Sequence, residues 1–237
     1  MDNAKILIYD GSFNGFLTTI YRAFDENIQV SDIQKNIIFQ GGLFSDTETV
    51  STQLEHAKSV WNGIQTKSHI AIRNIYFAFL SEHQRIEIIL YNYIKKLFSP
   101  KDMLSLNFPN DLESSINQLA NTVGKEKQHM EAYLKFNATA DGVQLAFINP
   151  DNDILPLISR HYRFKFPDSP WLIYDSKRDY GLYYNLKTVE LISLDTDVIP
   201  KSMEVHELTI KSSIVRKLHR QPMQKRRTAY AQERAAV

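Results

Sequence analysis

The chain has 237 residues, of which 43% are hydrophobic, 23% charged and 11% aromatic. This composition is typical of a globular protein with a substantial core, and it excludes collagen-like, coiled-coil and mostly disordered chains. The chain contains no cysteine, which excludes disulfides and Cys-ligated zinc or iron–sulfur sites. No apolar run approaches the roughly 18–20 residues that span a bilayer. The start MDNAKILIYDG has an acid at position two and lacks the long apolar stretch of a secretory signal, so we expect a cytoplasmic protein.

The net charge of +1 conceals an uneven distribution of charge along the chain. The segment from Lys211 to Val237 holds eight Lys and Arg residues and a single acid, Glu233, which leaves 20 basic and 26 acidic residues for the other 210. Lys and Arg side chains that neutralise phosphates release condensed counterions, so a basic end on an acidic body is a candidate phosphate-binding arm. A solvated tail, or an arm that folds back onto the body's own acids, explains the charge equally well.

The amino-terminal pattern predicts a strand, a turn and a helix. Residues 5–9 are a short apolar run, and the turn Asp10-Gly11-Ser12 closes it and can cap the next helix. Apolar residues then recur at helical spacing over residues 13–24. Gly11 is isolated, without the glycine repeat of a phosphate-binding loop, which argues against a nucleotide site here. Residues 27–44 look irregular.

A helical block is predicted next. From about Thr47 to Ser99 apolar residues recur every three or four positions, and Ser99-Pro100 ends the block because proline cannot continue a helix. Asp111 begins one more long helix, on which Gly124 is a candidate break. We place the helical part of the fold at about residues 12–132.

The pattern changes at Tyr133 to short aromatic and β-branched segments separated by turns. A helix over Ile154–Phe166 is expected between the second and third of the resulting strands. The sequence therefore predicts an α+β fold: an amino-terminal strand, a helical block and a mostly antiparallel sheet over about 133–200, in one domain over 1–210 with a basic tail over 211–237. The predicted strands are Tyr133–Ala138, Val143–Ile148, Trp171–Asp175, Gly181–Tyr184 and Val189–Ser193.

Polar residues first cluster where the helical part meets the sheet. Glu126, His129 and Tyr133 are three and four positions apart, so they can share one helical face. A carboxylate beside an imidazole can orient it as a base or a metal ligand, and we name Glu126, His129 and the more distant His161 as catalytic candidates. A structural pair on an exposed helix has the same spacing. The sequence holds no H-E-x-x-H motif and no nucleophile elbow, and we expect neither a metal site nor a cofactor.

Two later segments combine basic and aromatic residues. Arg160-His-Tyr-Arg-Phe-Lys-Phe166 suits stacked bases and phosphates, although an amphipathic segment with its three aromatic residues Tyr162, Phe164 and Phe166 in the core fits as well. The loop Asp175-Ser-Lys-Arg-Asp179 can present its cations to a phosphate or pair them with its own acids. The candidate nucleic-acid contacts are Arg163, Lys177, Arg178 and Tyr180 and, in the tail, Lys225, Arg226 and Arg227.

Three groups of residues, taken in order, resemble a known family. They are Tyr9-Asp-Gly-Ser-Phe-Asn-Gly-Phe-Leu17, then Glu126 with His129-Met130 leading to Phe136, then His161 through Trp171–Asp175 and Arg178–Tyr184. Together they resemble a bacterial family of unknown function that is assigned to DNA metabolism or DNA repair. Its members are typically encoded beside a radical-SAM protein, and a related domain is fused to uracil-DNA-glycosylase-like proteins. The resemblance spans nearly the whole chain and implies a radical-SAM partner.

The carboxyl end departs from the family's pattern. Gln221, Met223, Lys225 and Arg226 match it, whereas Gln224 replaces a proline and Arg227-Thr228 replace two aromatic residues. Lys165 also stands where an arginine is usual. The positive charge of the tail is kept while its stacking residues are absent.

We therefore expect an accessory protein of DNA metabolism or DNA repair that binds nucleic acid and acts with a radical-SAM partner. Two other classes stay open. One is an enzyme that acts on DNA or a nucleobase through Glu126, His129 and His161, and the other is a protein-only adaptor whose tail contacts an acidic partner. The enzyme predicts that these residues and Arg178 converge in the folded chain.

Overall fold

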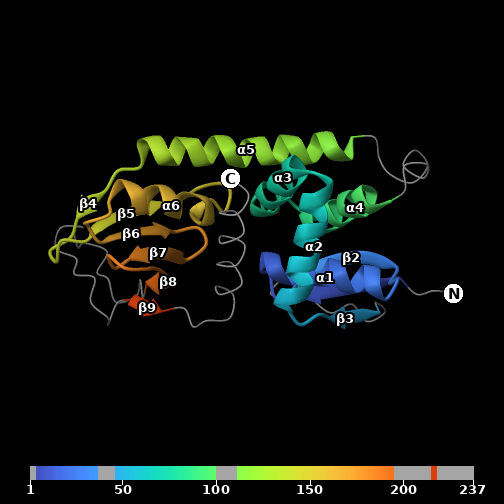
Figure 1. The fold of residues 1–237 in the computed structure, drawn as a ribbon. Coiled ribbons are helices and arrows are strands. Elements are labelled where there is room, and N and C mark those ends of the chain that lie inside the picture. The colour runs from blue at the N-terminus through green and yellow to red at the C-terminus, as the bar shows by residue number, and fades with distance from the viewer. Residues whose placement is uncertain (1–3, 37–45, 100–110, 195–214, 218–237) are drawn as a thin grey trace. The chain divides into compact units, whose positions relative to one another are not determined.

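The computed structural model describes residues 4–36, 46–99, 111–194 and 215–217 (Figure 1). The chain divides into two compact units between Val123 and Gly124, and each unit is described by itself. The division falls inside the long helix that begins after Asp111, within the single domain expected over residues 1–210. Among the described residues, no helix is both long and apolar enough to cross a membrane.

The first unit begins with a small parallel sheet in which β1 (Lys5–Tyr9) lies between β2 (Val30–Lys35) and β3 (Thr47–Thr49). The expected strand at β1 is confirmed. The expectation that residues 27–44 are irregular is wrong for β2, whose backbone pairs with β1 although its sequence VSDIQK has only two apolar residues. Polar side chains hide such a strand from a hydrophobic pattern, because backbone pairing rather than burial defines it. Residues 37–45 lie outside the described part of the chain.

Helix α1 (Phe13–Asp25) follows β1 and is capped by the predicted turn. Ser12 Oγ accepts a hydrogen bond from the Gly15 N–H at 2.9 Å, and the Asp10 carboxylate accepts from the Ser12 N–H at 3.0 Å. A Cβ on Gly15 would collide with Asp10 Oδ1, so this position needs glycine.

The helical block consists of α2 (Leu54–Lys67), α3 (His69–Leu80) and α4 (Ile86–Phe98). Aromatic rings join it to α1: Phe13 lies 4.9 Å from Tyr76 and 5.1 Å from Phe79 between ring centroids. The predicted helical start near Thr47 is wrong, because Thr47–Thr49 pairs with β1 as β3 and α2 begins at Leu54. The predicted end at Ser99 is confirmed.

Helix α5 (Leu112–Tyr133) runs without interruption through Gly124, the candidate break. Its residues up to Val123 belong to the first unit and the rest to the second. The strand predicted over Tyr133–Ala138 is wrong in its first half. The helix continues to Tyr133, and only Asn137–Ala138 forms strand β4. In the last turn of the helix, Met130 C=O accepts a hydrogen bond from the Tyr162 hydroxyl at 2.6 Å.

The second unit is built on a six-stranded sheet in the order β4-β5-β6-β7-β8-β9. Strands β5 and β6 are parallel and are connected through helix α6 (Leu155–Lys165), and the other neighbours are antiparallel. This confirms the predicted α+β class with its mostly antiparallel sheet. The last strand lies inside the segment expected as a tail. The bounds are β5 Gln144–Ile148, β6 Trp171–Asp175, β7 Tyr180–Tyr184, β8 Val189–Leu194 and β9 Val215–Lys217.

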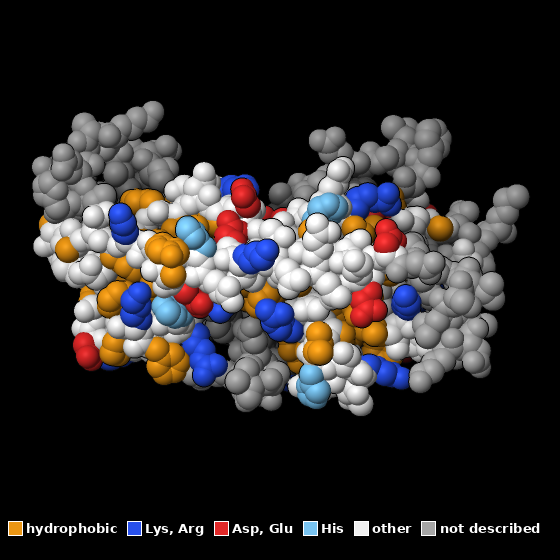
Figure 2. All heavy atoms as spheres, turned by 90° about the horizontal axis from the view of Figure 1, so that it is seen from above, with side chains coloured by type: hydrophobic (Ala, Val, Ile, Leu, Met, Phe, Trp, Pro, Cys, Tyr) orange, Lys and Arg blue, Asp and Glu red, His pale blue; other side chains and the backbone are white. Residues whose placement is uncertain are grey.

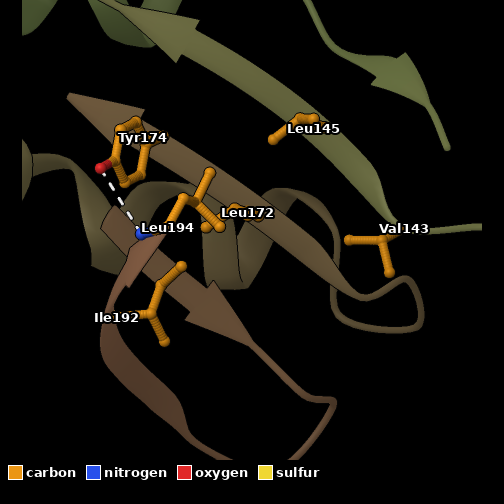
Figure 3. Close-up of a cluster of buried hydrophobic side chains, with 6 residues drawn as sticks. All are labelled: Val143, Leu145, Leu172, Tyr174, Ile192 and Leu194. Carbon is orange, nitrogen blue, oxygen red and sulfur yellow. Dashed lines mark hydrogen bonds between the residues drawn. The ribbon is translucent and has the colours of Figure 1, made fainter. Parts of the chain in front are cut away.

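Both faces of this sheet are apolar. On one face, side chains of β6 pack on α6, with the Trp171 and Tyr162 ring centroids 6.3 Å apart. Figure 3 shows the cluster on the other face, where the Leu194 N–H donates to the Tyr174 hydroxyl at 3.5 Å. The members of this cluster are Val143, Leu145, Leu172, Tyr174, Ile192 and Leu194.

Candidate functional site

Two of the polar candidates meet at the loop that follows β5. Because β5 and β6 are parallel, the residues after both strands lie at one edge of the sheet, where open α/β sheets place ligands. Glu126 reaches this loop from α5. One of its carboxylate oxygens accepts from the Asp151 N–H at 2.7 Å, and the other accepts from the Asn152 N–H at 2.9 Å and the Asn152 side-chain amide at 2.6 Å.

Arg178 holds the same loop by its carbonyl groups. Its Nη1 donates to Pro150 C=O at 3.2 Å and to Asp175 Oδ2 at 2.8 Å, and its Nη2 donates to Asp151 C=O at 2.9 Å. Lys177 Nζ also donates to Asp151 C=O, at 3.1 Å. We call Glu126, Asp175, Lys177 and Arg178 around residues 150–152 the loop clamp.

The Asp175–Arg178 pair is the buried part of the loop clamp, and the groups of the clamp bond to one another. The Asp175 side chain is 0% exposed and the Arg178 side chain 9%, and Asp175 Oδ1 also accepts from the Lys177 and Arg178 N–H groups at 2.9 and 3.3 Å. Charge-assisted hydrogen bonds of this kind are about twice as strong as neutral ones. The loop clamp therefore fixes the turn after β6 against the loop after β5.

Acids outnumber bases around the loop clamp. Asp151 and the buried Asp153, which accepts a hydrogen bond from the Tyr180 hydroxyl, add to the carboxylates of Glu126 and Asp175. Two cations, Lys177 and Arg178, stand against these four acids. A phosphate here would meet a net negative field and would have to displace the loop carbonyls from both cations.

His161 lies on α6 beside a carboxylate that the sequence analysis did not name. Its Nδ1 is 3.9 Å from Glu131 Oε1, and Glu131 also forms an ion pair with Lys127 at 3.1 Å. The His161 Nε2 atom is buried without a hydrogen-bond partner among the described residues. The four-residue spacing of Lys127 and Glu131 in a helix predicts the ion pair between these two residues. The contact of Glu131 with His161 has no such local pattern.

The structure does not bring all the predicted catalytic candidates together. Glu126 and Arg178 hold one loop, whereas His161 pairs with Glu131, and the exposed His129 ring lies 4.9 Å from that of Tyr133. Among the described residues, no group of three His, Asp or Glu side chains is arranged to hold a metal ion.

Two buried tyrosines in this unit have strongly raised pKa values. Burial, with a smaller contribution from the charge of Glu131, raises the pKa of Tyr162 to about 12. Burial and the hydrogen bond to Asp179 raise the pKa of Tyr174 to about 12. Both hydroxyls therefore stay protonated at neutral pH and act as hydrogen-bond donors.

A second polar surface lies on the exposed side of α6, and its charge is opposite to that of the loop clamp. Tyr162 and Phe166 face the core, whereas Phe164 is 65% exposed, because residues two positions apart lie on opposite sides of a helix. This corrects the alternative that placed all three rings in the core. The Arg160 guanidinium lies 5.6 Å from the Phe164 ring centroid.

The turn between β7 and β8 extends this surface. Arg163 Nη2 donates to Lys187 C=O at 3.4 Å, and the Tyr184 hydroxyl donates to Leu186 C=O at 2.9 Å and to Pro167 C=O at 3.1 Å. We call this set the α6 surface and define it as Arg160, Arg163, Phe164, Lys165, Leu186 and Lys187. Figure 2 looks onto the side that carries α5, and in the part formed by the second unit basic, acidic, histidine and hydrophobic side chains are all visible.

The tail residues Lys225, Arg226 and Arg227 lie outside the described residues. The sequence analysis named Arg163 among the candidate nucleic-acid contacts and included Phe164 in the basic and aromatic segment, but it named neither Leu186 nor Lys187. Helical periodicity applied to residues 160–166 was enough to place Phe164 outside. The contribution of the β7–β8 turn depends on tertiary structure, which no local pattern reveals.

The fold and these two surfaces define an α+β protein whose second unit carries a polar, internally paired loop and a cationic, aromatic helix face. The model of one family, the domain of unknown function DUF4130, matches residues 84–233. The chain belongs to this family. The match covers the loop clamp and the α6 surface, whereas β1, β2, β3 and α1 precede it. No match to the chain is found among curated proteins.

Proposed function

We propose that this protein is a nucleic-acid-binding accessory protein of DNA metabolism and that the α6 surface is its structured contact. The observation that carries the proposal is the unbalanced charge of this surface. It presents Arg160, Arg163, Lys165 and Lys187, and within residues 159–168 and 186–188 the only acid is Asp168. No ion pair to these four cations occurs among the described residues.

The contrast with the loop clamp supports this choice of surface. The cations of the loop clamp donate to carbonyl groups and to Asp175, whereas those of the α6 surface belong to exposed residues and have no carboxylate partner among the described residues. Arg160 and Lys165 lie over aromatic rings, and Arg163 donates to Lys187 C=O. Exposed Lys and Arg that meet phosphates release counterions, which supplies most of the sequence-independent affinity for nucleic acid. The arrangement favours binding over acid–base catalysis through Glu126, whose two oxygens accept three hydrogen bonds from the loop.

The basic carboxyl-terminal segment adds to this surface in the proposal. It carries a strong excess of Lys and Arg, and without aromatic residues at Arg227 and Thr228 it contributes charge rather than base contacts. The role in DNA metabolism and the radical-SAM partner rest on the family resemblance given in the sequence analysis.

Co-expression with a radical-SAM protein tests the partner. When either protein is purified, the two proteins are expected to elute together.

The binding experiment uses charge reversal on the α6 surface. Fluorescence anisotropy of a labelled oligonucleotide is measured across a salt series for the full chain and for the double variant Arg163→Glu/Lys187→Glu. The variant is expected to bind more weakly to every sequence. Its log affinity should fall less steeply with log salt, by about 0.7–0.9 for each phosphate that the variant no longer neutralises.

Lys67→Glu/Lys95→Glu is the matched control. Both residues are exposed lysines in the last turns of α2 and α4 in the first unit, so the same double reversal of charge is made away from the α6 surface. The control is expected to retain the affinity and the salt slope of the full chain. Equal losses in the control and the double variant would show that net charge, rather than this surface, governs binding.

A truncation tests the tail separately. Removing Gln221–Val237 deletes Lys225, Arg226, Arg227 and Arg234 while sparing β9, which ends at Lys217. A weaker affinity with a flatter salt slope is expected. Failure of the full chain to bind any oligonucleotide at low salt would overturn the proposal and favour the protein-only adaptor.

A further inference from the structure

We infer that the α6 surface binds single-stranded nucleic acid by stacking an unpaired base on Phe164. The inference rests on the proposed function and deepens it by naming the form of nucleic acid. It starts from the position of this ring. Phe164 is 65% exposed on α6, whereas Tyr162 of the same helix and Phe166 just after its end stack on each other on the core side.

The Phe164 ring is held within a cationic setting. The Arg160 guanidinium lies 5.6 Å from its centroid, at the distance of a cation–π contact, which restricts both side chains. Most of the ring remains accessible, and an accessible aromatic ring beside arginine is the platform on which proteins stack bases of any sequence. The ring lacks hydrogen-bond donors and acceptors, so it selects for an exposed base face and not for a particular base.

The turn between β7 and β8 adds Lys187 to the cations of α6. Arg163 precedes Phe164 in the helix and bonds to the turn at Lys187 C=O, and the Tyr184 hydroxyl ties the same turn to Pro167. Leu186 in this turn is 49% exposed and has a positive φ of 71°. A bulky residue held in this conformation is strained, and such strain is retained where the surroundings over-determine the backbone. The turn thus presents an apolar side chain and Lys187 beside α6.

An exposed ring together with neighbouring cations should bind single strands and duplexes differently. In a duplex the base faces are covered by their neighbours, so the α6 surface can reach phosphates but Phe164 has no base to stack on. In a single strand the phosphates meet Arg163 and Lys187 while one base is free to lie on the ring. An acidic protein would satisfy the cations without using the ring.

The experiment compares Phe164→Ala and Phe164→Trp in the full chain. The probes are a labelled thymidine 12-mer, chosen for weak base stacking, and a duplex of the same length. Phe164→Ala is expected to weaken single-strand binding by about 5- to 150-fold, the range for loss of one stacked base. Duplex affinity should change by less than about twofold, because phosphate contacts are kept. Phe164→Trp should retain or improve single-strand binding, because indole is the larger stacking surface.

Three outcomes separate this inference from the proposed function. Unchanged single-strand binding in Phe164→Ala, with loss in the Arg163→Glu/Lys187→Glu variant, would overturn the stacking inference alone. Competition by poly-glutamate as effective as that by the thymidine oligonucleotide would also overturn it, in favour of an acidic protein partner. Absence of binding to either probe by the full chain would overturn both proposals. Circular dichroism of each variant confirms that α6 is intact.

Discussion

Two arginines of the second unit illustrate opposite uses of one side chain. Arg178 is nearly buried, donates to Asp175 and to two loop carbonyls, and holds backbone in place. Arg163 is exposed and forms one long hydrogen bond, to Lys187 C=O at 3.4 Å. The sequence analysis named both as candidate nucleic-acid contacts, and for Arg178 it also left open a pairing with the loop's own acids, which the structure shows.

The different surroundings of these two arginines indicate which part of the second unit is the better candidate for ligand binding. The loop clamp lies at the carboxyl ends of two parallel strands, the position at which ligand sites are common, yet its donors and acceptors are already paired. The α6 surface lies on a plain helix face, yet its cations and its Phe164 ring are exposed. Exposed groups with few internal partners, rather than topology, mark the better candidate for binding.

The largest effect is expected from Arg178→Ala. The change leaves the carboxylate of Asp175, which is 0% exposed, without its ion-pair partner and frees two loop carbonyls. Removing one member of a buried ion pair costs about 3–5 kcal/mol, so the free energy of unfolding should fall by that amount. Urea denaturation followed by circular dichroism measures it. A decrease below about 1 kcal/mol would contradict the structural role of Arg178.

Glu126→Ala is the next largest change. It removes the acceptor of three hydrogen bonds from residues 151 and 152 and leaves the donors of the partly buried Asn152 amide unpaired. We expect a decrease of about 1–3 kcal/mol in the free energy of unfolding. Glu113→Ala, an exposed glutamate in the first turn of the same helix, is the control and should cost no more than about 1 kcal/mol. Equal decreases would show that the loop bonds contribute little.

The raised tyrosine pKa values predict how stability depends on pH. Tyr162 and Tyr174 have pKa values of about 12 in the folded chain against an ordinary value of 10.0, so the unfolded chain releases these protons first as pH rises. The contribution to stability is complete below pH 10.0 and is lost as pH rises toward about 12. Denaturation midpoints across this window measure the decrease.

Asp179→Asn sharpens this test at a single hydroxyl. The hydrogen bond and the charge of Asp179 both raise the pKa of Tyr174, and the substitution removes the charge while leaving an amide oxygen as acceptor, so that pKa should fall while Tyr162 stays unchanged. Ultraviolet titration of phenolate absorbance, with Tyr174→Phe as the reference, follows the residue. Identical titration curves for Asp179→Asn and the unsubstituted chain would argue against the Tyr174–Asp179 bond.

The smallest effect on stability is expected from the α6 surface. Arg163→Ala and Phe164→Ala remove exposed groups with few internal contacts, so each should change the free energy of unfolding by no more than about 0.5 kcal/mol. The same urea denaturation applies. A large decrease in either variant would assign that residue to the fold and abolish the contrast with Arg178.

The fold was predictable from the sequence where local pattern and final environment agree. The apolar run Trp171–Asp175 forms β6 with the predicted bounds, and α6 deviates by one residue at each end. Strands β2 and β3 were missed because their side chains are mostly polar. Their pairing partner β1 is also not adjacent in the sequence, since α1 lies between β1 and both strands. Short strands of this kind are defined by tertiary contacts.

The candidate site was predictable only in part, for a related reason. The segment Arg160–Phe166 was found from its mixture of charge and rings, and helical geometry sorts those rings into inner and outer ones. Other contacts depend on the order of the strands and on the crossover between them. Glu126 and Arg178 bind the same loop from different elements, and Lys187 lies beside Arg163. A single sequence contains no direct record of these long-range pairings.

Strand β9 shortens one edge of the six-stranded sheet. It pairs along Ile192–Leu194, so the sheet ends on a strand of three residues in place of the six residues of β8. An uncovered edge is a template on which a second copy of the chain can add a strand. Shortening the protein to before Val215 would bare this edge, and the shortened chain should form oligomers and precipitate at concentrations at which the full chain stays monodisperse.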